Sequence, residues 1–434
     1  MITEAKRLIP IVLVLAAAFA FSCAARAGVT LVDLPESGSE TELLWQKKFS
    51  DTFFKAPSVP AIRGDSLFIM TGNELSRLDR FTGEVTGTAA LRSRCVFSTV
   101  SVVFCGNTAI CPMVDGIVQA FDADTLGEKW TYTDPLGGQC LTQPVIESGL
   151  IFTGFWYGET DDAAFVCLDA GTGEAVWRYV RPGGFYGTVA CIVDDCVIIG
   201  SEDAAVGSDG GSELICLDAL TGKVLSTLPV TGEIRSGVAY DDISGRMFAV
   251  SKAAYLYSFS LDNGKLTDLE TLKLSGASTS RPVVYNGRLY IGVSGGCRDS
   301  GGIAVIDAGN LSVIYTMKTP GYCQTELTVK PRFDDYKTVT VYGTYNYPPG
   351  GIIAFTDGEG VTSAEAREIF SPAASAYCLS PIVAADTGEL YYKNDTCTVF
   401  ALKKTNAGVN PVLSKLFSLI TSVISVFANA GFFG

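Results

Sequence analysis

The sequence contains no histidine at all. This absence excludes Ser-His-Asp and Cys-His catalysis, HExxH zinc sites and imidazole general bases. Two segments resemble hydrolase nucleophile motifs, GDSL at residues 64–67 and GVSGG at residues 292–296. Because both motifs need a histidine base, we interpret them as turns between strands.

Other site signatures are also missing. The chain has no CxxC pair, which argues against a zinc knuckle or a thioredoxin-like motif, and it has no P-loop or GxGxxG run. Charged residues make up only 18% of the chain, and the net charge is −14. An acidic chain repels phosphate backbones, so a nucleic-acid partner is not expected.

The composition favours a large all-β protein. Hydrophobic residues make up 47% of the 434 residues, aromatic residues make up 11%, and there are 46 glycines. This combination is typical of many short strands joined by tight turns around a sizeable core.

The N-terminus predicts export. Lys6 and Arg7 precede an apolar run from Leu8 to Ser22, and an Ala-Arg-Ala sequence at residues 25–27 offers a cleavage site. We therefore expect residues 1–27 to be a signal peptide and the protein to be extracytoplasmic, either secreted or attached to the cell surface. Cys23 is an alternative lipidation site. A permanent transmembrane helix is disfavoured because the apolar run is short for a bilayer.

The chain carries an internal repeat. CLDAGTGEAVW at residues 167–177 and CLDALTGKVLS at residues 216–226 are near copies, and residues 77–87 and 120–130 match them. Weaker copies begin at residues 258, 305, 354 and 401, so that the units recur every 42 to 49 residues. A unit of this size accommodates four strands and their turns, which is one blade of a β-propeller.

The repeated turn has a clear physical logic. Its aspartate can accept hydrogen bonds from turn N–H groups, and its glycine can adopt a positive φ. The aromatic residue that closes the motif, as in Trp130, Trp177 and Tyr315, is expected to pack between neighbouring blades.

This pattern resembles the pyrroloquinoline-quinone-like (quinoprotein-type) propeller repeat. Relatives include quinoprotein dehydrogenases and the propeller lipoprotein of the outer-membrane assembly machinery. The resemblance covers about residues 43–404 and implies an eight-bladed β-propeller, with seven blades as the alternative. The last unit lacks an outer strand, and residues 43–49 read as a spare strand. We therefore expect this N-terminal strand to close the eighth blade and remove an open sheet edge.

The repeat alone does not imply catalysis. Dehydrogenases of this family hold their quinone over a tryptophan with a bound calcium, and they commonly have a disulfide between adjacent cysteines. This chain has only four tryptophans and no adjacent cysteines. We expect no cofactor and no metal, and a dehydrogenase dependent on pyrroloquinoline quinone and calcium remains the alternative.

The loops suggest where a partner binds. Four connections between the second and third strands of a blade are long: residues 155–164, 202–212, 294–301 and 343–350. All four are expected on one face of the ring, and long loops on a rigid scaffold often carry binding sites. The candidate ligand-binding residues are Trp156, Tyr157, Glu159, Asp161, Asp162, Glu202, Asp203, Asp209, Arg298, Asp299, Tyr345 and Tyr347. The alternative is that these loops are tolerated insertions.

The cysteines suggest disulfides in an exported protein. Removal of Cys23 with the signal leaves 12 of the 13 cysteines. The candidate pairs are Cys297 with Cys323, Cys378 with Cys397, Cys105 with Cys111, and Cys191 with Cys196. Sequence alone does not fix the pairing.

Residues 405–434 leave the repeat and form a tail. Apolar residues from Leu413 to Phe427 recur every 3 or 4 positions, which predicts an amphipathic helix. The segment 411–428 could associate with a membrane or cell surface, or dock against the propeller's own side. The predicted layout is a signal peptide (1–27), a linker (28–42), the propeller (43–404) and this tail.

The sequence favours a non-catalytic extracytoplasmic binding or scaffold propeller. Its partner, whether protein, peptide or glycan, is expected on the face that bears the four long loops.

Overall fold

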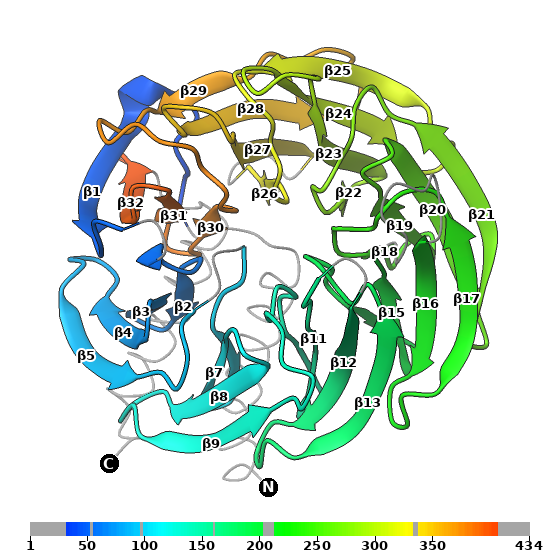
Figure 1. Cartoon of the computed structure of the whole chain (residues 1–434). Helices are drawn as coiled ribbons and strands as arrows, with labels where there is room; N and C mark the ends of the chain where they lie inside the picture. Colours follow the sequence, from blue (N-terminus) through cyan, green and yellow to red (C-terminus); the bar gives the residue numbers. More distant parts are fainter. Residues whose placement is uncertain are drawn as a thin grey trace, which may run out of the picture.

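The computed structural model describes residues 32–52, 55–95, 99–158, 161–202, 212–332 and 337–406. Within these ranges the chain forms eight four-stranded antiparallel sheets arranged as a ring (Figure 1). The predicted eight-bladed all-β propeller is therefore confirmed, and the seven-bladed alternative is wrong.

In blades 1 to 7 the strands run outward from the axis in chain order, and in blade 8 the outer place is taken by the first strand of the chain. Blade 1 comprises β2 (Ala61–Arg63), β3 (Ser66–Thr71), β4 (Glu74–Asp79) and β5 (Val85–Ala90), and blade 2 comprises β6 (Val103–Cys105), β7 (Thr108–Pro112), β8 (Ile117–Asp122) and β9 (Glu128–Thr133). Blade 3 comprises β10 (Val145–Glu147), β11 (Leu150–Gly154), β12 (Asp162–Asp169) and β13 (Ala175–Pro182), and blade 4 comprises β14 (Cys191–Val193), β15 (Cys196–Gly200), β16 (Ser212–Asp218) and β17 (Val224–Val230).

Blade 5 comprises β18 (Ala239–Asp241), β19 (Arg246–Val250), β20 (Tyr255–Asp262) and β21 (Lys265–Lys273). Blade 6 comprises β22 (Val283–Tyr285), β23 (Arg288–Ser294), β24 (Gly301–Asp307) and β25 (Val313–Thr319). Blade 7 comprises β26 (Thr328–Pro331), β27 (Thr338–Thr344), β28 (Ile352–Gly358) and β29 (Arg367–Phe370). Blade 8 contains β30 (Val383–Ala384), β31 (Leu390–Asn394) and β32 (Thr398–Lys404), with β1 (Thr41–Lys48) as its outer strand, preceded by the 3-10 turn η1 (Gly38–Glu40).

The N-terminal strand closes the ring, as predicted. β1 pairs antiparallel with β32 along its whole length, from Thr41 opposite Lys404 to Lys48 opposite Thr398. The segment before β1 is also anchored, because Asp33 Oδ2 forms an ion pair with Lys404 Nζ at 2.6 Å. Chain segments about 360 residues apart are thereby joined in one sheet, and blade 8 has no missing strand.

The two middle strands of each blade form most of the core. In blade 3, for example, the whole of β12 from Ala163 to Leu168 is buried, whereas the outer strand β13 alternates between exposed and buried residues. This pattern follows from position, because middle strands are covered by the neighbouring blades and outer strands face solvent.

The repeated aspartate organises the turn between the third and fourth strands. In blade 3, Asp169 Oδ1 accepts hydrogen bonds from the backbone N–H groups of Gly171 and Thr172 and from the Thr172 hydroxyl, at 2.8–3.1 Å. Gly173 follows with φ of 75°. Asp79, Asp122 and Asp218 make the same three bonds in blades 1, 2 and 4.

A closing tryptophan links blades 2, 3 and 8 to the blade that follows each of them in the ring. Trp177 of blade 3 donates its indole N–H to Ala219 O of blade 4 at 2.9 Å, and its ring lies on Gly222. A Cβ on Gly222 would come within 2.5 Å of that ring, so this glycine is required for the contact as well as for its positive φ. Trp130 makes the same contact from blade 2 to blade 3.

Trp45 makes this contact across the closure. It lies on β1, donates to Arg80 O at 2.9 Å and packs on Gly83 of blade 1. The contact between blades therefore continues through the junction of the two chain ends.

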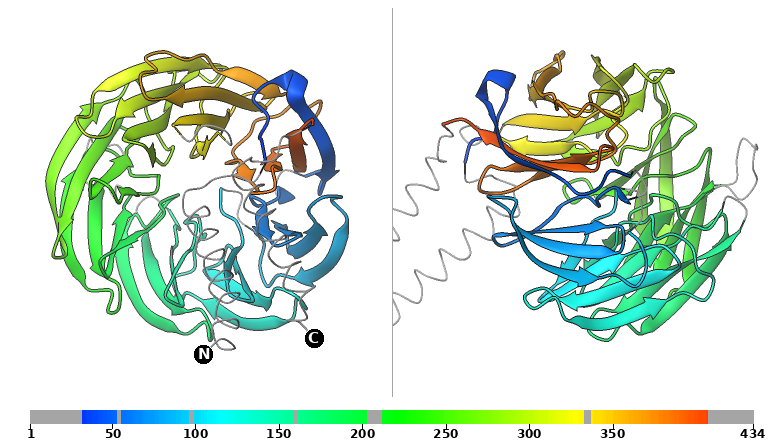
Figure 2. Two further views of the ribbon diagram at one scale, coloured as in Figure 1. Left: turned by 180° about the vertical axis from the view of Figure 1, so that it is seen from behind. Right: turned by 60° about the vertical axis from the view of Figure 1, so that its left-hand side comes forward.

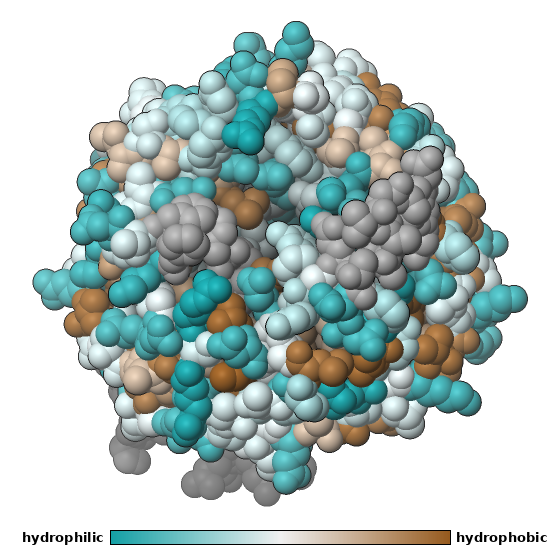
Figure 3. All heavy atoms as spheres, viewed as in Figure 1, coloured by the Kyte–Doolittle hydropathy of each residue, from teal (hydrophilic) through white to brown (hydrophobic). Residues whose placement is uncertain are grey.

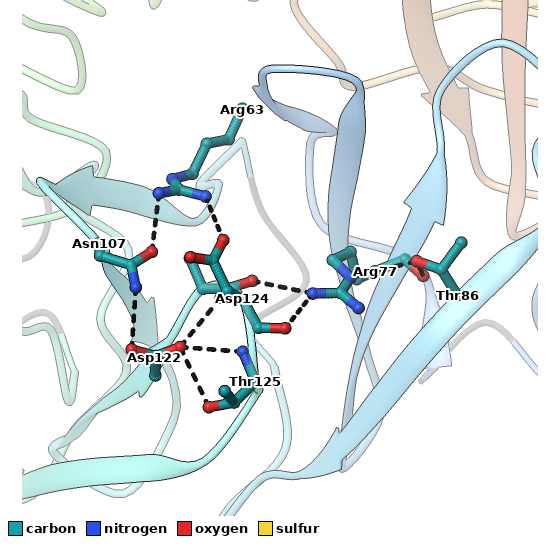
Figure 4. A network of polar contacts seen from close by, with 8 residues as sticks. Arg63, Arg77, Thr86, Asn107, Asp122, Asp124 and Thr125 are labelled. Carbon is teal, nitrogen blue, oxygen red and sulfur yellow. Dashed lines mark hydrogen bonds and ion pairs between the residues drawn. The ribbon is translucent and has the colours of Figure 1, made fainter.

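Where the tryptophan is absent, another group takes over. Gly87 stands at that position in blade 1, and the Arg77 guanidinium donates instead to Ala123 O and Asp124 O of blade 2 (Figure 4). Arg63 strengthens the same junction by bonding Asp124 and Asn107.

A buried charge joins blades 6 and 7. Tyr315 takes the tryptophan position, and its hydroxyl donates to Asp357 Oδ1 at 2.7 Å. Asp357 is fully buried and also accepts from Tyr290 at 2.7 Å and from Arg288 at 2.9 Å. Since a buried carboxylate is costly unless it is fully bonded, these three donors are all needed.

Several predictions fall outside the described residues. These are the signal peptide at residues 1–27, lipidation at Cys23, and the tail helix at residues 411–428. No helix within the described ranges is long and apolar enough to cross a membrane.

The contact of Trp177 with blade 4 predicts a large loss of stability in Trp177→Ala. We expect the substitution to cost about 3–5 kcal/mol, because it removes a buried indole and leaves Ala219 O without its donor. Urea unfolding followed by circular dichroism measures the change. Leu220→Ala, at an exposed position of the same turn, should change stability by less than about 0.5 kcal/mol. Equal unfolding midpoints for the two variants would contradict this account of the junction.

The turn of Asp169 predicts a dependence on pH. The backbone N–H of Thr172 is the main cause that lowers the pKa of Asp169 below its usual value of 3.8. A lowered folded-state pKa stabilises the protein above the unfolded-state value, and this contribution is lost as the pH falls through the folded-state value. Asp169→Asn should therefore be less stable than the native chain at pH 7, and the difference should shrink below about pH 4. Thermal unfolding across that range measures it, with Asp242→Asn at an exposed turn as the control. A difference that is constant with pH would refute the role of this carboxylate.

Candidate functional site

The described parts of the four long loops lie on one face of the ring, as predicted, because each loop connects the second and third strands of its blade. They join β11 to β12, β15 to β16, β23 to β24 and β27 to β28. The connections from the outer strand of one blade to the inner strand of the next lie on the same face as these loops, whereas the Asp-Thr-Gly turns lie on the opposite face. We call the first surface the loop face. It is the face seen in Figures 1 and 3, and the side view in Figure 2 shows the two faces apart.

The loop face is mainly hydrophilic. Figure 3 shows polar residues over most of its described part, with apolar residues in small separate groups. Tyr157 is the most exposed aromatic residue among those predicted to bind, with 64% of its surface accessible. Arg298, Asp299, Asp161 and Asp162 are also exposed.

Other predicted residues have structural roles. Tyr345 is buried, and its hydroxyl donates to Glu368 at 2.6 Å, so the prediction that it contacts a ligand is corrected. Trp156 packs edge-on against Tyr186, with ring centroids 5.2 Å apart. Glu159, Asp203 and Asp209 lie outside the described residues. The nine described residues among the twelve come from the loops of four blades, 3, 4, 6 and 7.

Glu202 forms the strongest polar contact near the axis. Its carboxylate, only 1% exposed, accepts two hydrogen bonds of 2.7 Å from Arg235. The Arg235 guanidinium also lies 4.4 Å from the centroid of the Tyr186 ring. Burial raises the pKa of Glu202 above its usual value, although Arg235 acts in the opposite direction. A bidentate pair of this kind is rigid and fixes the position of Arg235.

A central cavity of about 440 Å³ opens on the loop face. It is formed mainly where the connections between blades meet the innermost strands, and its charged and amide residues are Gln143, Arg235, Lys252, Arg281, Gln324 and Glu326. We call it the axial cavity. Sequence reasoning missed these residues because it followed the long loops. Aligning the residues just before the first strand of each repeat would have found most of them.

The cations of the axial cavity are all compensated. Lys252 pairs with Glu233 at 3.2 Å, and Arg281 pairs with Glu326 at 3.7 Å. Together with the pair of Arg235 and Glu202, three basic side chains face three acidic ones. The described rim of the axial cavity therefore carries no net charge.

The axial cavity does not fit a quinone cofactor. The only aromatic residue among its described lining is Tyr186, and Arg235 lies against that ring. The described residues also contain no group of three or more Asp, Glu, His or Cys side chains able to hold a metal ion. The tryptophan platform and calcium ligands that the quinoprotein resemblance implies have no counterpart there.

The cysteines correct another prediction. All twelve described cysteines are free thiols, so none of the four predicted pairs is bridged. Cys105 lies opposite Thr108 in the ladder of β6 and β7, and Cys111 is three residues further along β7. Three residues of strand span about 10 Å, and a disulfide requires Cα atoms within about 7 Å. Cys191 and Cys196 lie opposite other residues, Ile198 and Val193.

The remaining cysteine pairs have different surroundings. Cys297 is exposed, whereas Cys323 is fully buried. The thiols of Cys378 and Cys397 donate to the carbonyl oxygens of Lys393 and Thr52. Burial raises the pKa of Cys323 and of Cys378 to about 12, which keeps these thiols protonated and unreactive.

With this geometry established, comparison with known proteins identifies the family. The family model described as outer membrane protein assembly factor BamB matches residues 27–159 and 166–408. The chain belongs to this family. The BamB relationship agrees with the predicted repeat, since it covers all eight blades. A comparison with curated proteins gives no match.

Solved structures share the BamB-like fold at low identity. BamB from Moraxella catarrhalis is 16% identical with a TM-score of 0.57, covering 84% of this chain and 99% of its own. Quinohemoprotein alcohol dehydrogenase from Comamonas testosteroni is 12% identical with a TM-score of 0.63, covering 84% of this chain and 76% of its own. The related enzyme from Pseudomonas putida HK5 is 11% identical with a TM-score of 0.62, covering 87% and 80% respectively. These likenesses show the fold and do not decide between an assembly factor and an enzyme.

The lining of the axial cavity predicts no response to quinone. A ligand that binds only the native state raises the midpoint of thermal unfolding by mass action. We expect pyrroloquinoline quinone to leave the midpoint of the purified chain unchanged, both with and without Ca²⁺. A calcium-dependent rise would contradict this and favour the dehydrogenase alternative.

Proposed function

We propose that this BamB-family chain is a non-catalytic extracytoplasmic propeller that binds a partner on its loop face. The observation that carries the proposal is the division of the ring into two unlike faces. The opposite face is built from repeated turns, whereas the loop face carries four long and dissimilar connections. Binding surfaces on rigid scaffolds are commonly built from such loops.

The chemistry of the loop face supports recognition over reaction. The chain has no histidine, and the charged groups around the axial cavity are engaged in ion pairs. Exposed side chains such as Tyr157 and Arg298 can contact a partner without first breaking an internal bond. Tyrosine and arginine are also enriched at protein interfaces.

The family description supports an extracytoplasmic location and a protein partner. Outer membrane assembly is the role that the family name gives to its members. Applied to this chain, that role would place the loop face against another component of an envelope assembly. The predicted signal peptide is consistent with this location.

Site-specific photo-crosslinking tests the proposal. A photoreactive amino acid is placed at Tyr157 or Arg298 on the loop face, or at Ile243 or Leu220 on the opposite face. All four side chains are exposed, Ile243 at 83% and Leu220 at 67%. We expect a discrete adduct in cells from the loop-face positions, and none from the other two. Adducts confined to Ile243 and Leu220 would refute the assignment of the binding face.

A further inference from the structure

A second cavity lies on the loop face, where three consecutive blades meet. Its volume is about 540 Å³, within the range of about 300–1,000 Å³ that is common for small-molecule sites. The loop between β23 and β24 contributes Arg298, the loop between β27 and β28 contributes Asn346, and the turn between β31 and β32 contributes Asp395. The connections between blades add Tyr322, Gln324 and Tyr377. We call it the Cys297 cavity, after an exposed thiol in its wall.

The walls of the Cys297 cavity are held in place by bonds between blades. The backbone N–H of Asn346 donates to Tyr322 O at 2.9 Å, and its side-chain amide donates to Gln324 Oε1. The N–H of Asp395 donates to Tyr377 O at 3.0 Å. Tyr347 holds the Tyr377 ring edge-to-face, with centroids 6.4 Å apart. A cavity fixed in this way loses little conformational entropy when a ligand binds.

The lining excludes an apolar ligand. It consists of tyrosine, amide and charged side chains together with serine, glycine and cysteine, and it contains no aliphatic residue and no phenylalanine. A pocket that captures a peptide side chain at a protein interface is normally built around apolar anchors. The Cys297 cavity is therefore suited to a ligand that is polar over most of its surface.

Two observations narrow the ligand further. Asn346 Oδ1 and Asp395 Oδ1 are buried and have no hydrogen-bond donor in the structure, and both residues line the cavity. Unsatisfied acceptors favour a ligand rich in O–H or N–H groups. The lining contains one basic residue, Arg298, and one acidic residue, Asp395, and so offers no cluster of like charges that would select an anion or a cation; this favours a neutral ligand.

We propose that the Cys297 cavity binds a neutral saccharide unit. The 37%-exposed Tyr377 ring supplies a surface for the C–H face of the sugar, because an aromatic ring combines an apolar body with defined geometry. The sugar hydroxyls can donate hydrogen bonds to the carboxylate of Asp395 and accept them from the guanidinium of Arg298. The amides of Asn346 and Gln324 can act as donors or acceptors. This inference rests on the proposed function, since it assigns a ligand class to one part of the loop face.

The rate at which the Cys297 thiol is labelled reports directly on ligand binding in the cavity. Cys297 is the exposed thiol among the described cysteines, so maleimide should label it first in the native chain. The probes are neutral trisaccharides of glucose, mannose, galactose and N-acetylglucosamine, and calorimetry measures their affinity. At about twice the Kd, one third of the sites are free, so labelling should slow about threefold.

Matched variants locate the binding. Tyr377→Ala should abolish the protection of Cys297, and Tyr377→Phe should retain it because the ring remains. Tyr240→Ala is the control, since Tyr240 is equally exposed at 37% but does not line the cavity. Binding of none of the trisaccharides would overturn the proposal, and so would protection that persists in Tyr377→Ala. Loop-face crosslinks obtained without saccharide binding would overturn this inference alone and leave the proposed function standing.

Discussion

The contact between one blade and the turn region of the next is the interaction on which the ring depends, and a closing tryptophan supplies it at three junctions. A four-stranded sheet cannot bury both of its faces alone, so each blade needs its neighbour. Trp130 and Trp177 provide that contact through one hydrogen bond and one stacked glycine each. Trp45 repeats it between the last blade and the first, which makes closure an instance of the same contact.

This constraint also explains why the two faces differ. The turn that receives the tryptophan is fixed by its aspartate bonds and by a glycine with positive φ, and it therefore recurs with little change. The loops at the other end of the strands take no part in this contact. These loops can lengthen at a low entropic cost. The axial cavity and the Cys297 cavity both open among them or beside them.

Much of the fold could be predicted because the repeat is local. The spacing of the Asp-Thr-Gly turns gave the number of blades, and the spare strand at residues 43–49 gave the closure. The roles of Arg77 and Asp357 could not be predicted in this way. Arg77 replaces a missing tryptophan by reaching across a junction, and Asp357 accepts the hydroxyl of Tyr315, which stands at the tryptophan position of blade 6; both contacts depend on three-dimensional neighbours.

The candidate site was predicted less well for a related reason. Loop length predicted that the four connections share one face, but it does not show whether a side chain points outward. Tyr345 and Glu202 lie within or beside long loops and yet are buried by bonds to Glu368 and Arg235, partners far away in the sequence. The two predicted disulfides across hairpins, Cys105 with Cys111 and Cys191 with Cys196, failed similarly, because spacing along a hairpin does not fix the register of its strands.

The ion pairs around the axial cavity affect which chemistry this part of the ring can support. Catalysis requires a group whose protonation or charge changes during the reaction, and such a group is usually left partly uncompensated. In the axial cavity each base instead faces an acid: Arg235 with Glu202, Lys252 with Glu233, and Arg281 with Glu326. A ligand gains little from displacing these pairs. Two buried oxygens without a hydrogen-bond donor, Asn346 Oδ1 and Asp395 Oδ1, belong instead to residues that line the Cys297 cavity. This position of polar groups away from the axis supports the proposal that the loop face binds a partner, since a shared propeller fold alone does not decide between binding and cofactor chemistry.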